Sequence, residues 1–406
     1  MNEMNSKLKY AAWLLALIAV NNVIYLTPSL ASGYYVVMAA GLLYGLAVSR
    51  AHITFNPAGI LFWLACAVSI VANEVPAFFS PWQRLGTFVI VSGLLGPFLF
   101  SRELCRMRIF MFRAVNILFA VVIVVSFLGL FCGVSRYHAY SGYFCGITTH
   151  SMLLGPISGC TVLYMFYRLY HWKNSERGKK LFSLIVLFMS VCLLFGAASR
   201  SAFIATAAGV VVLHCIYVRN RKAKLYKIAL FGTLALVIFT PVLEPYYAKL
   251  LAKNGNEEFL NFDSRADHWR LHWESFKENP ITGIGFSTID VDPEINTLGD
   301  NGRVETGSSW LSILSMTGIL GFCSFCFLLM GAFRILYRNL RRHELEVAFG
   351  GGLLSFWCVH MLAEGYVLSA GGLLFFSFWL LLGTIYSYDV LRRKVRPVAE
   401  ARNLHE

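Results

Sequence analysis

Long apolar runs are the feature that most limits how this chain can fold. Runs of roughly 20 residues, the length that crosses about 30 Å of hydrocarbon, recur along most of the chain. A segment inside a bilayer must satisfy its own backbone hydrogen bonds, so only helices and closed barrels cross it. Continuous apolar runs favour helices over alternating strands. The sequence therefore predicts an all-α polytopic membrane protein.

The runs predict twelve spans and one large loop between them. The spans lie near residues 10–30, 32–49, 58–79, 85–101, 109–134, 151–171, 181–198, 201–218, 225–243, 308–335, 347–369 and 372–390. The expected domains are spans one to nine in residues 1–243, a loop with short helices in 244–307, the last three spans in 308–390, and a basic tail in 391–406.

The basic residues predict the orientation of these spans. If both termini and alternate loops face the cytoplasm, that side holds 25 of the 35 Lys and Arg residues. This is the positive-inside pattern, so the net charge of +13 does not indicate a nucleic-acid partner. Both termini are then cytoplasmic, and the large loop is periplasmic in a bacterial inner membrane.

The large loop concentrates the polar chemistry, since it carries twelve of the 22 acidic residues. Aromatic residues at helical spacing predict a helix from Ser264 to Glu278, which Asn279 and Pro280 end before a turn at Gly283 and Gly285. The basic side of this helix holds Arg265, His268 and His272, and its aromatic side holds Trp269, Trp273 and Phe276. Such a helix can lie at the membrane surface with its polar side facing inward.

Arg200 and Arg265 are the residues most suited to bind a phosphate. Arg200 lies in a very short connection between two apolar runs, where a charge is costly unless it faces a cavity or a partner. A guanidinium binds phosphate oxygens through paired hydrogen bonds and stays charged at any working pH. The alternatives are an Arg200 that reaches the membrane interface and an Arg265 that is solvated or contacts lipid head groups.

His360 and Glu364 are candidates for proton transfer. Their spacing of four places them on one face of a predicted helix, and titratable groups inside a span indicate function by default. The alternative is a structural pair that ties helices together. Glu305 precedes a span and is a third candidate, as a base or an ion-pair partner of an arginine, or else as a solvated acid.

Four further residues are expected to contact substrate: His268, Arg270, His150 and Tyr143. The last two lie in a predicted outer loop, where an ordinary loop role is the alternative. Cys132 and Cys145 flank the same loop, which leaves a disulfide open. We predict no metal site and no cofactor.

Five motifs, taken together, resemble the O-antigen ligase and O-antigen polymerase superfamily of bacterial envelope enzymes. They are GAASRSA around Arg200, SRADHWR around Arg265, ENPITGIGF after it, SSWLSILSMTGILG from residue 308, and HMLAEGYVLSAGG from residue 360. The resemblance implies a fold similar to membrane glycosyltransferases of the C type. It also implies transfer of a glycan from undecaprenyl diphosphate to an acceptor hydroxyl at the periplasmic face, without metal. Arg200 and Arg265 match two arginines that hold the diphosphate in this family.

The acceptor distinguishes two functions within this superfamily. A polymerase extends another lipid-linked glycan, for O-antigen, capsule or exopolysaccharide, and a ligase transfers polymer to the lipid A core. Ligases of the family carry a His-Asn pair where this chain has Gly307 and Ser308, which favours a polymerase. A chain-length regulator and membrane lipids are further expected partners. The alternative class is a secondary transporter. The absence of repeated halves and the presence of a single acidic loop argue against a transporter.

Overall fold

Helices form nearly all of the regular structure that the computed structural model describes, in residues 2–49, 53–137, 142–172, 176–218, 263–289, 307–341 and 344–402. The first helices are α1 (Asn2–Asn21), α2 (Gly33–Ala47), α3 (Pro57–Ala72), the 3-10 helix η1 (Ala77–Phe79), α4 (Pro81–Leu95), α5 (Arg102–Leu128) and α6 (Ser151–His171). The later helices are α7 (Arg177–Gly196), α8 (Arg200–Val218), α10 (Asp263–Glu278), α11 (Ser309–Asn339), α12 (Glu344–His360) and α13 (Leu373–Arg402).

Two small antiparallel ribbons accompany the helices. Strand β1 (Thr54–Phe55) pairs with β2 (Leu99–Phe100), and β3 (Arg136–Tyr137) pairs with β4 (Phe144–Gly146). Each ribbon joins the ends of helices and forms no layer of its own. The predicted all-α class is therefore confirmed for the described residues.

Six described helices are long and apolar enough to cross a membrane, namely α5, α6, α7, α8, α11 and α13. Helices α2 and α3 are apolar but shorter. Eleven of the twelve predicted segments overlap a helix, whereas residues 225–243 and most of the loop 244–307 lie outside the described residues. The structure thus supports a multi-pass membrane protein without confirming the number twelve.

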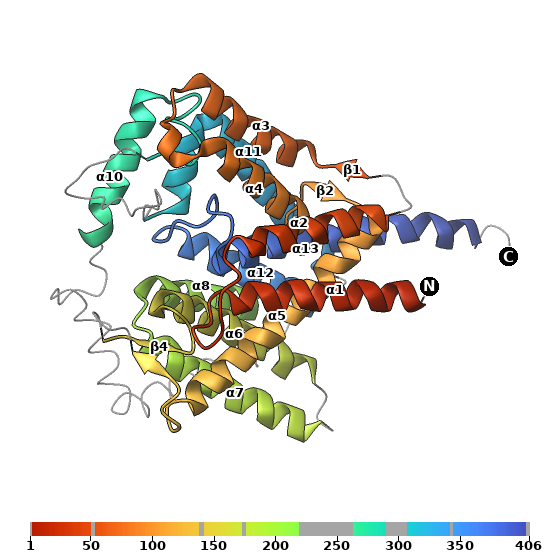
Figure 1. The fold of residues 1–406 in the computed structure, drawn as a ribbon. Helices are drawn as coiled ribbons and strands as arrows, with labels where there is room; N and C mark the ends of the chain where they lie inside the picture. The colour runs from red at the N-terminus through yellow and green to blue at the C-terminus, as the bar shows by residue number, and fades with distance from the viewer. Residues whose placement is uncertain are drawn as a thin grey trace.

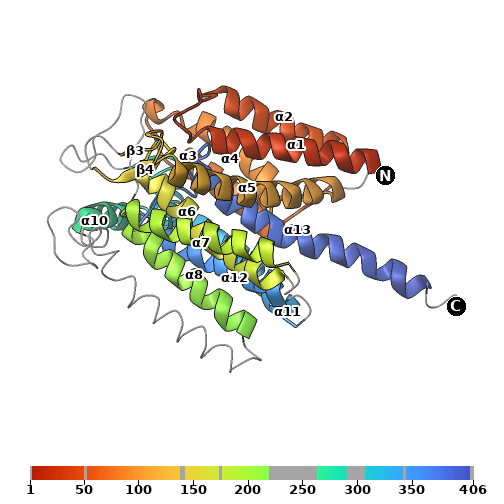
Figure 2. The ribbon, with the colours of Figure 1, turned by 90° about the horizontal axis from the view of Figure 1, so that it is seen from below.

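The helices run roughly side by side and leave two distinct ends to the bundle (Figure 1). Both termini lie at one end, and α10 lies at the other. Seen from below, α1 and α2 lie on one side of the bundle and α7 and α8 on the opposite side (Figure 2). The end that carries α10 is called the α10 end below, and the opposite one the terminal end.

Polar residues at the edges of the apolar runs fix where several helices begin. Asn56 accepts a hydrogen bond from the amide of Ala58, and Pro57 occupies the first turn of α3. Ser101 caps α5 and Ser308 caps α11 in the same way, through the third amide of each helix. These side chains satisfy amide groups that have no partner within the helix.

Aromatic rings in edge-to-face and tilted contact fill the centre of the bundle. The Phe62 ring of α3 lies 6.0 Å from Phe88 of α4, 5.8 Å from Phe325 of α11 and 6.1 Å from Trp379 of α13, measured between ring centroids. Phe286, in the turn after α10, lies 5.5 Å from Phe88. All five rings are buried. This packing ties the exit of α10 to the core of the bundle.

Arg108 is one of the 25 basic residues that the sequence places on the cytoplasmic side, but in the structure it is completely buried. Its guanidinium donates to the carbonyl oxygens of Gly93, Leu94 and Leu99 at 2.7, 2.7 and 2.8 Å. These carbonyls lie at and after the C-terminal end of α4, where acceptors have no partner within the helix. Arg108 is therefore a structural cap and contributes nothing to the charge of the surface.

Candidate active site

The exit of α10 is bound to a kink in α11. Gly318 interrupts α11 with φ of 61°, and a Cβ atom there would lie 2.2 Å from the carbonyl oxygen of Ile281. The amide of Ile284 donates to the Ser315 carbonyl at 2.9 Å, and Asn73 of the α3 end donates to the Gly283 carbonyl at 2.8 Å. The predicted helix end at Asn279 and the glycine turn after it are confirmed.

His272 attaches the buried side of α10 to α11. Its Nδ1 lies 2.7 Å from the Ser315 hydroxyl and its Nε2 lies 3.5 Å from the Ser312 hydroxyl. The His272 side chain is buried together with Leu271, whereas Trp273 is 48% exposed. The structure therefore assigns His272 an anchoring role, with Trp273 of the aromatic side left at the surface.

His268 occupies the space beside Gly307, the residue before the cap of α11. Gly307 has φ of 60°, and a Cβ atom there would lie 2.9 Å from the Cβ of His268. Trp269 donates from Nε1 to the Gly307 carbonyl at 3.4 Å. The Nδ1 atom of His268 is buried and has no hydrogen-bond partner among the described residues. Residue 307 must be small because α10 packs directly against it.

Arg265 and Glu364 meet at the α10 end of the bundle. The guanidinium Nη2 lies 3.2 Å from Oε1 of Glu364, and the two side chains are 15% and 16% exposed. They come from residues 99 positions apart in the sequence. A charge-assisted contact with so little exposure is stronger than a surface ion pair. Both groups still have an exposed fraction that a substrate can reach.

The main chain around Glu364 is bound to the start of α11. The amide and hydroxyl of Ser309 donate to the Glu364 carbonyl at 3.0 and 2.7 Å, and the amide of Tyr366 donates to the Ser309 hydroxyl at 3.0 Å. Ser309 was not among the residues predicted from the sequence. The available signal was the pair Ser308-Ser309 before an apolar run, which is typical of a helix start.

His360 and Glu364 do not share a helix face, so that prediction was wrong. Helix α12 ends at His360, and Glu364 belongs to the loop that leads to α13. The bonds from Ser309 hold this loop in a non-helical course. His360 is 1% exposed and stacks on Phe356 with a centroid distance of 5.6 Å. The charge of Arg265 acts on His360, so the two lie in one neighbourhood.

Arg200 is the first residue of α8, after the turn that follows α7. The turn contains Ala198 with φ of 50°, which is unusual for a residue with a Cβ atom, and the buried Ser199. A Cβ atom on Gly155 of α6 would lie 2.8 Å from the Ser199 Cβ, so α6 and α8 touch here. Burial raises the pKa of Tyr143, and the positive charge of Arg200 opposes this shift. The phenol thus stays protonated beside Arg200.

The packing of α8 against α12 determines where Arg200 lies along the length of the bundle. Gly209 and Gly352 face each other, and a Cβ atom on either one would lie 2.8 or 2.9 Å from the carbonyl oxygen of the other. The helices are antiparallel, so Arg200 and His360 both lie beyond this contact toward the α10 end. At about 1.5 Å per residue both are about 12–14 Å from it. Arg200 is therefore level with the end of α12, where Arg265 and Glu364 meet.

The remaining candidates are less closely associated with this site. His150 caps α6, because its Nδ1 accepts from the amide of Met152 at 3.0 Å. Arg270 forms an exposed pair with Asp267 at 3.3 Å. Glu305 lies outside the described residues. Cys132 and Cys145 are not bonded, because all ten cysteines are free thiols.

The chemistry of this region rests on two cations of fixed charge, one carboxylate and several hydroxyl groups. Guanidinium groups suit diphosphate oxygens, and a carboxylate accepts a proton or orients a guanidinium. Among the described residues, no group of three or more His, Cys, Asp or Glu side chains is placed to hold a metal ion.

Comparison with known proteins identifies the central part of the chain. Residues 185–326 match the family model described as O-antigen ligase. The matched segment runs from within α7 into α11, and it includes Arg200 and Arg265. No curated protein matches the chain.

Proposed function

We propose that the protein is a glycosyltransferase that polymerises undecaprenyl-diphosphate-linked repeat units, because residues 185–326 match the O-antigen ligase family model. The polymer is an O-antigen, a capsule or an exopolysaccharide. The observation that supports this proposal most is the pairing of Arg265 with Glu364 at the end of α12, level with Arg200.

The diphosphate of the donor binds between Arg200 and Arg265. In the structure, Arg265 contacts Glu364. A diphosphate offers Arg265 a bidentate partner, so donor binding draws the guanidinium away from the carboxylate. This exchange leaves Glu364 available for the acceptor. The half-buried Arg200 and the protonated hydroxyl of Tyr143 supply further hydrogen-bond donors at the same level.

Transfer proceeds by a single displacement that needs no metal. The acceptor hydroxyl oxygen attacks the anomeric carbon, the bond from that carbon to the diphosphate oxygen breaks, and the electron pair stays on the diphosphate. The guanidinium groups stabilise the charge that grows on this leaving group, most strongly in the transition state. Glu364 accepts the proton of the hydroxyl. The anomeric centre is inverted, and undecaprenyl diphosphate leaves.

The surroundings of Gly307 favour a polymerase over a ligase. A histidine at this position would collide with His268, so this chain has no room for the His-Asn pair that the resemblance associates with ligases. The family description favours the ligase, which would transfer finished polymer to the lipid A core. The two functions share the donor site and differ in the acceptor alone.

The reaction takes place on the periplasmic side of the inner membrane. The positive-inside pattern assigns the terminal end to the cytoplasm, and α10 with Arg265 then lies at the outer surface. Within the predicted loop 244–307, helix α10 carries Arg265 at this surface, between the spans predicted in residues 1–243 and 308–390. A chain-length regulator would act on the growing polymer at this surface.

Complementation of a deletion strain tests the proposal. Deletion of the gene removes the distribution of long chains and leaves single repeat units on lipid A, and the wild-type gene restores the distribution. Arg265→Ala does not restore it, whereas Lys277→Ala, which removes an exposed cation from the same helix, does. Loss of all polymer from lipid A, with lipid-linked polymer accumulating, would select the ligase. Unchanged glycan with loss of solute uptake would select a transporter.

A further inference from the structure

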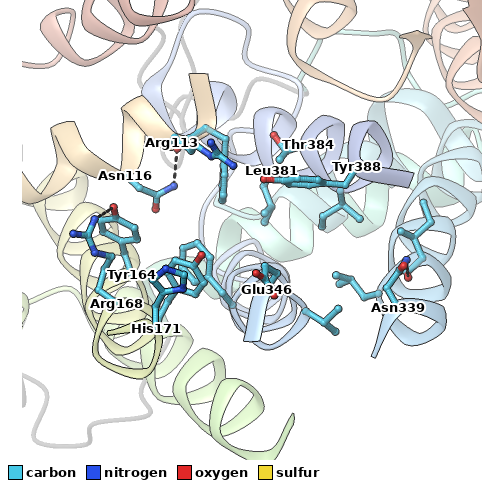
Figure 3. A pocket seen from close by; sticks show the side chains of 18 of the residues that line it. Arg113, Asn116, Tyr164, Arg168, His171, Asn339, Glu346, Leu381, Thr384 and Tyr388 are labelled. Carbon is cyan, nitrogen blue, oxygen red and sulfur yellow. Dashed lines mark hydrogen bonds between the residues drawn. The ribbon is translucent and has the colours of Figure 1, made fainter. Parts of the chain in front are cut away.

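A cavity with both charged and apolar lining lies at the terminal end of the bundle, opposite the site described above. It has a volume of about 530 Å³, within the usual range of ligand pockets. Its lining comes from α5, α6, α11, α12 and α13 (Figure 3). On α12 it reaches Gly350, which is ten residues, or about 15 Å, from His360. The two sites are therefore separate.

The cavity combines positive charge with an apolar wall. Three guanidinium groups, those of Arg113, Arg168 and Arg392, line it against the single carboxylate of Glu346. In Figure 3 Arg113 and Arg168 lie across the space from Glu346 and Tyr388. The apolar lining is formed by Phe112, Ile117, Ile335, Leu336, Leu381 and Ile385. A ligand that satisfies both parts is an anion with a hydrocarbon portion.

Several polar groups of the lining lack a protein partner. Arg168 donates from Nη1 to the Tyr164 hydroxyl at 2.9 Å, and its guanidinium lies 4.4 Å from the ring centroid of Trp172. Its Nε atom, the Nε1 atom of Trp172 and the hydroxyl of Thr384 are all buried without a hydrogen-bond partner among the described residues. Buried donors of this kind are costly unless a ligand or water accepts their hydrogen bonds.

Arg113 and Arg392 are placed so that they can reach such a ligand. Arg113 is exposed, and its charge acts on Tyr167, as does that of Glu346. All three residues line the cavity. Arg392 donates to the side chain of Asn339 at 3.2 Å and keeps its other nitrogen atoms for another acceptor.

We propose that this cavity binds the phosphate head group of an anionic phospholipid from the leaflet at the terminal end. The phosphate pairs with the guanidinium groups, and the acyl chains leave along the apolar wall beside Ile117, which is 38% exposed. Basic pockets between spanning helices on the cytoplasmic side bind anionic lipids in this way. A lipid suits the site better than a soluble phosphate, because four of the five lining helices are membrane spans.

Native mass spectrometry of the full-length protein tests the site, with mixed micelles that contain phosphatidylglycerol or phosphatidylcholine. The wild type retains one phosphatidylglycerol in preference to phosphatidylcholine. The double variant Arg113→Gln/Arg392→Gln binds it at least about tenfold more weakly, since each arginine near such a surface contributes about a factor of five. Arg334→Gln is the matched control, because it removes an exposed arginine of α11 at the same end but outside the cavity.

The opposite change gives a test that does not depend on losing a cation. Glu346→Gln removes the single carboxylate and tightens binding of phosphatidylglycerol severalfold. Equal retention of both lipids, or unchanged retention by the double variant and by Glu346→Gln, would overturn the proposal. Displacement of the lipid by glycerol phosphate at equal concentration would overturn the choice of a lipid as the source. If the double variant does not fold, lipid retention by two single variants, Arg392→Gln and Glu346→Gln, is compared with the wild type instead.

Discussion

At Glu364 the main chain and the side chain have different roles. The carbonyl holds the loop to Ser309, and the carboxylate pairs with Arg265. Glu364→Gln leaves the carbonyl in place and removes the charge. We therefore expect a stable protein with at least about 10²-fold lower transfer activity, because the general base is lost.

The control for this change is Glu274→Gln, an identical substitution on the exposed side of α10. It should leave the transfer rate within twofold of the wild type. The rate of chain extension and the thermal unfolding temperature, measured for both variants, separate the roles. Full activity in Glu364→Gln would remove the carboxylate from the mechanism.

At the residue scale, the sequence indicated candidate side chains but not the contacts that they make. Arg265 was predicted to bind phosphate from an amphipathic helix, which stays a prediction, and its carboxylate partner was unpredictable at a separation of 99 residues. The expected pairing of Glu364 with His360 assumed a helix that continues past residue 360. Ser309, which lies 55 positions before Glu364, binds the loop instead. Local spacing contains no information about such a contact.

Helices α10 and α11 depend on each other through Gly318. Any Cβ atom at Gly318 would collide with the Ile281 carbonyl, and φ there is positive. Gly318→Ala should therefore destabilise the protein by at least about 2 kcal/mol, because a backbone with φ of 61° and ψ of −166° is essentially restricted to glycine and costs any other residue about 1–3 kcal/mol, before the collision is counted. We expect a lower unfolding temperature in detergent and reduced activity, since the exit of α10 separates from α11.

Gly86 provides the matched control for this prediction. It lies within α4, and a Cβ atom there would meet nothing within 4 Å. Gly86→Ala should leave stability unchanged or raise it by up to about 1 kcal/mol, because alanine favours a helix. Equal unfolding temperatures for Gly318→Ala and the wild type would contradict the proposed dependence of α10 on the kink.

At the element scale, apolar runs and capping residues predicted most helices but not their ends. Helix α4 begins at Pro81, earlier than the apolar run indicated, because Pro81 suits the first turn of a helix. Helix α12 ends earlier than expected, for the tertiary reason given above. Arg108 was misassigned for a related reason: a buried arginine that caps carbonyls has the same sequence signature as one in a cytoplasmic loop.

At the scale of the whole molecule, the distribution of charge and the arrangement of the helices both indicate that the two ends of the bundle differ chemically. The terminal end carries the basic clusters and the anionic-lipid cavity, and the α10 end carries the proposed active site. This distinction was predictable from the sequence because positive charge marks cytoplasmic loops. The cavity at the terminal end was not, since its lining comes from five helices that are distant in the sequence.

Labelling with a membrane-impermeant maleimide tests this orientation. Cys132 is exposed beyond the end of α5 that faces the α10 side. In intact spheroplasts we expect the reagent to modify Cys132, and to modify the cysteine introduced by Ala399→Cys only after lysis. Peptide mass spectrometry identifies the labelled positions. The reverse pattern would place Arg265 in the cytoplasm and would be incompatible with a periplasmic reaction.

We propose that Arg200 and Arg265 act together on one lipid-linked diphosphate. The most direct test is kcat/KM for chain extension, measured with purified protein and undecaprenyl-diphosphate-linked repeat units. We expect Arg200→Ala and Arg265→Ala each to lower kcat/KM by about 10²–10³-fold, the usual cost of removing one group that stabilises transition-state charge. Arg265→Lys should remain poor, and Lys277→Ala should retain wild-type activity. Wild-type kcat/KM in either folded arginine-to-alanine variant would show that the two arginines do not share this role.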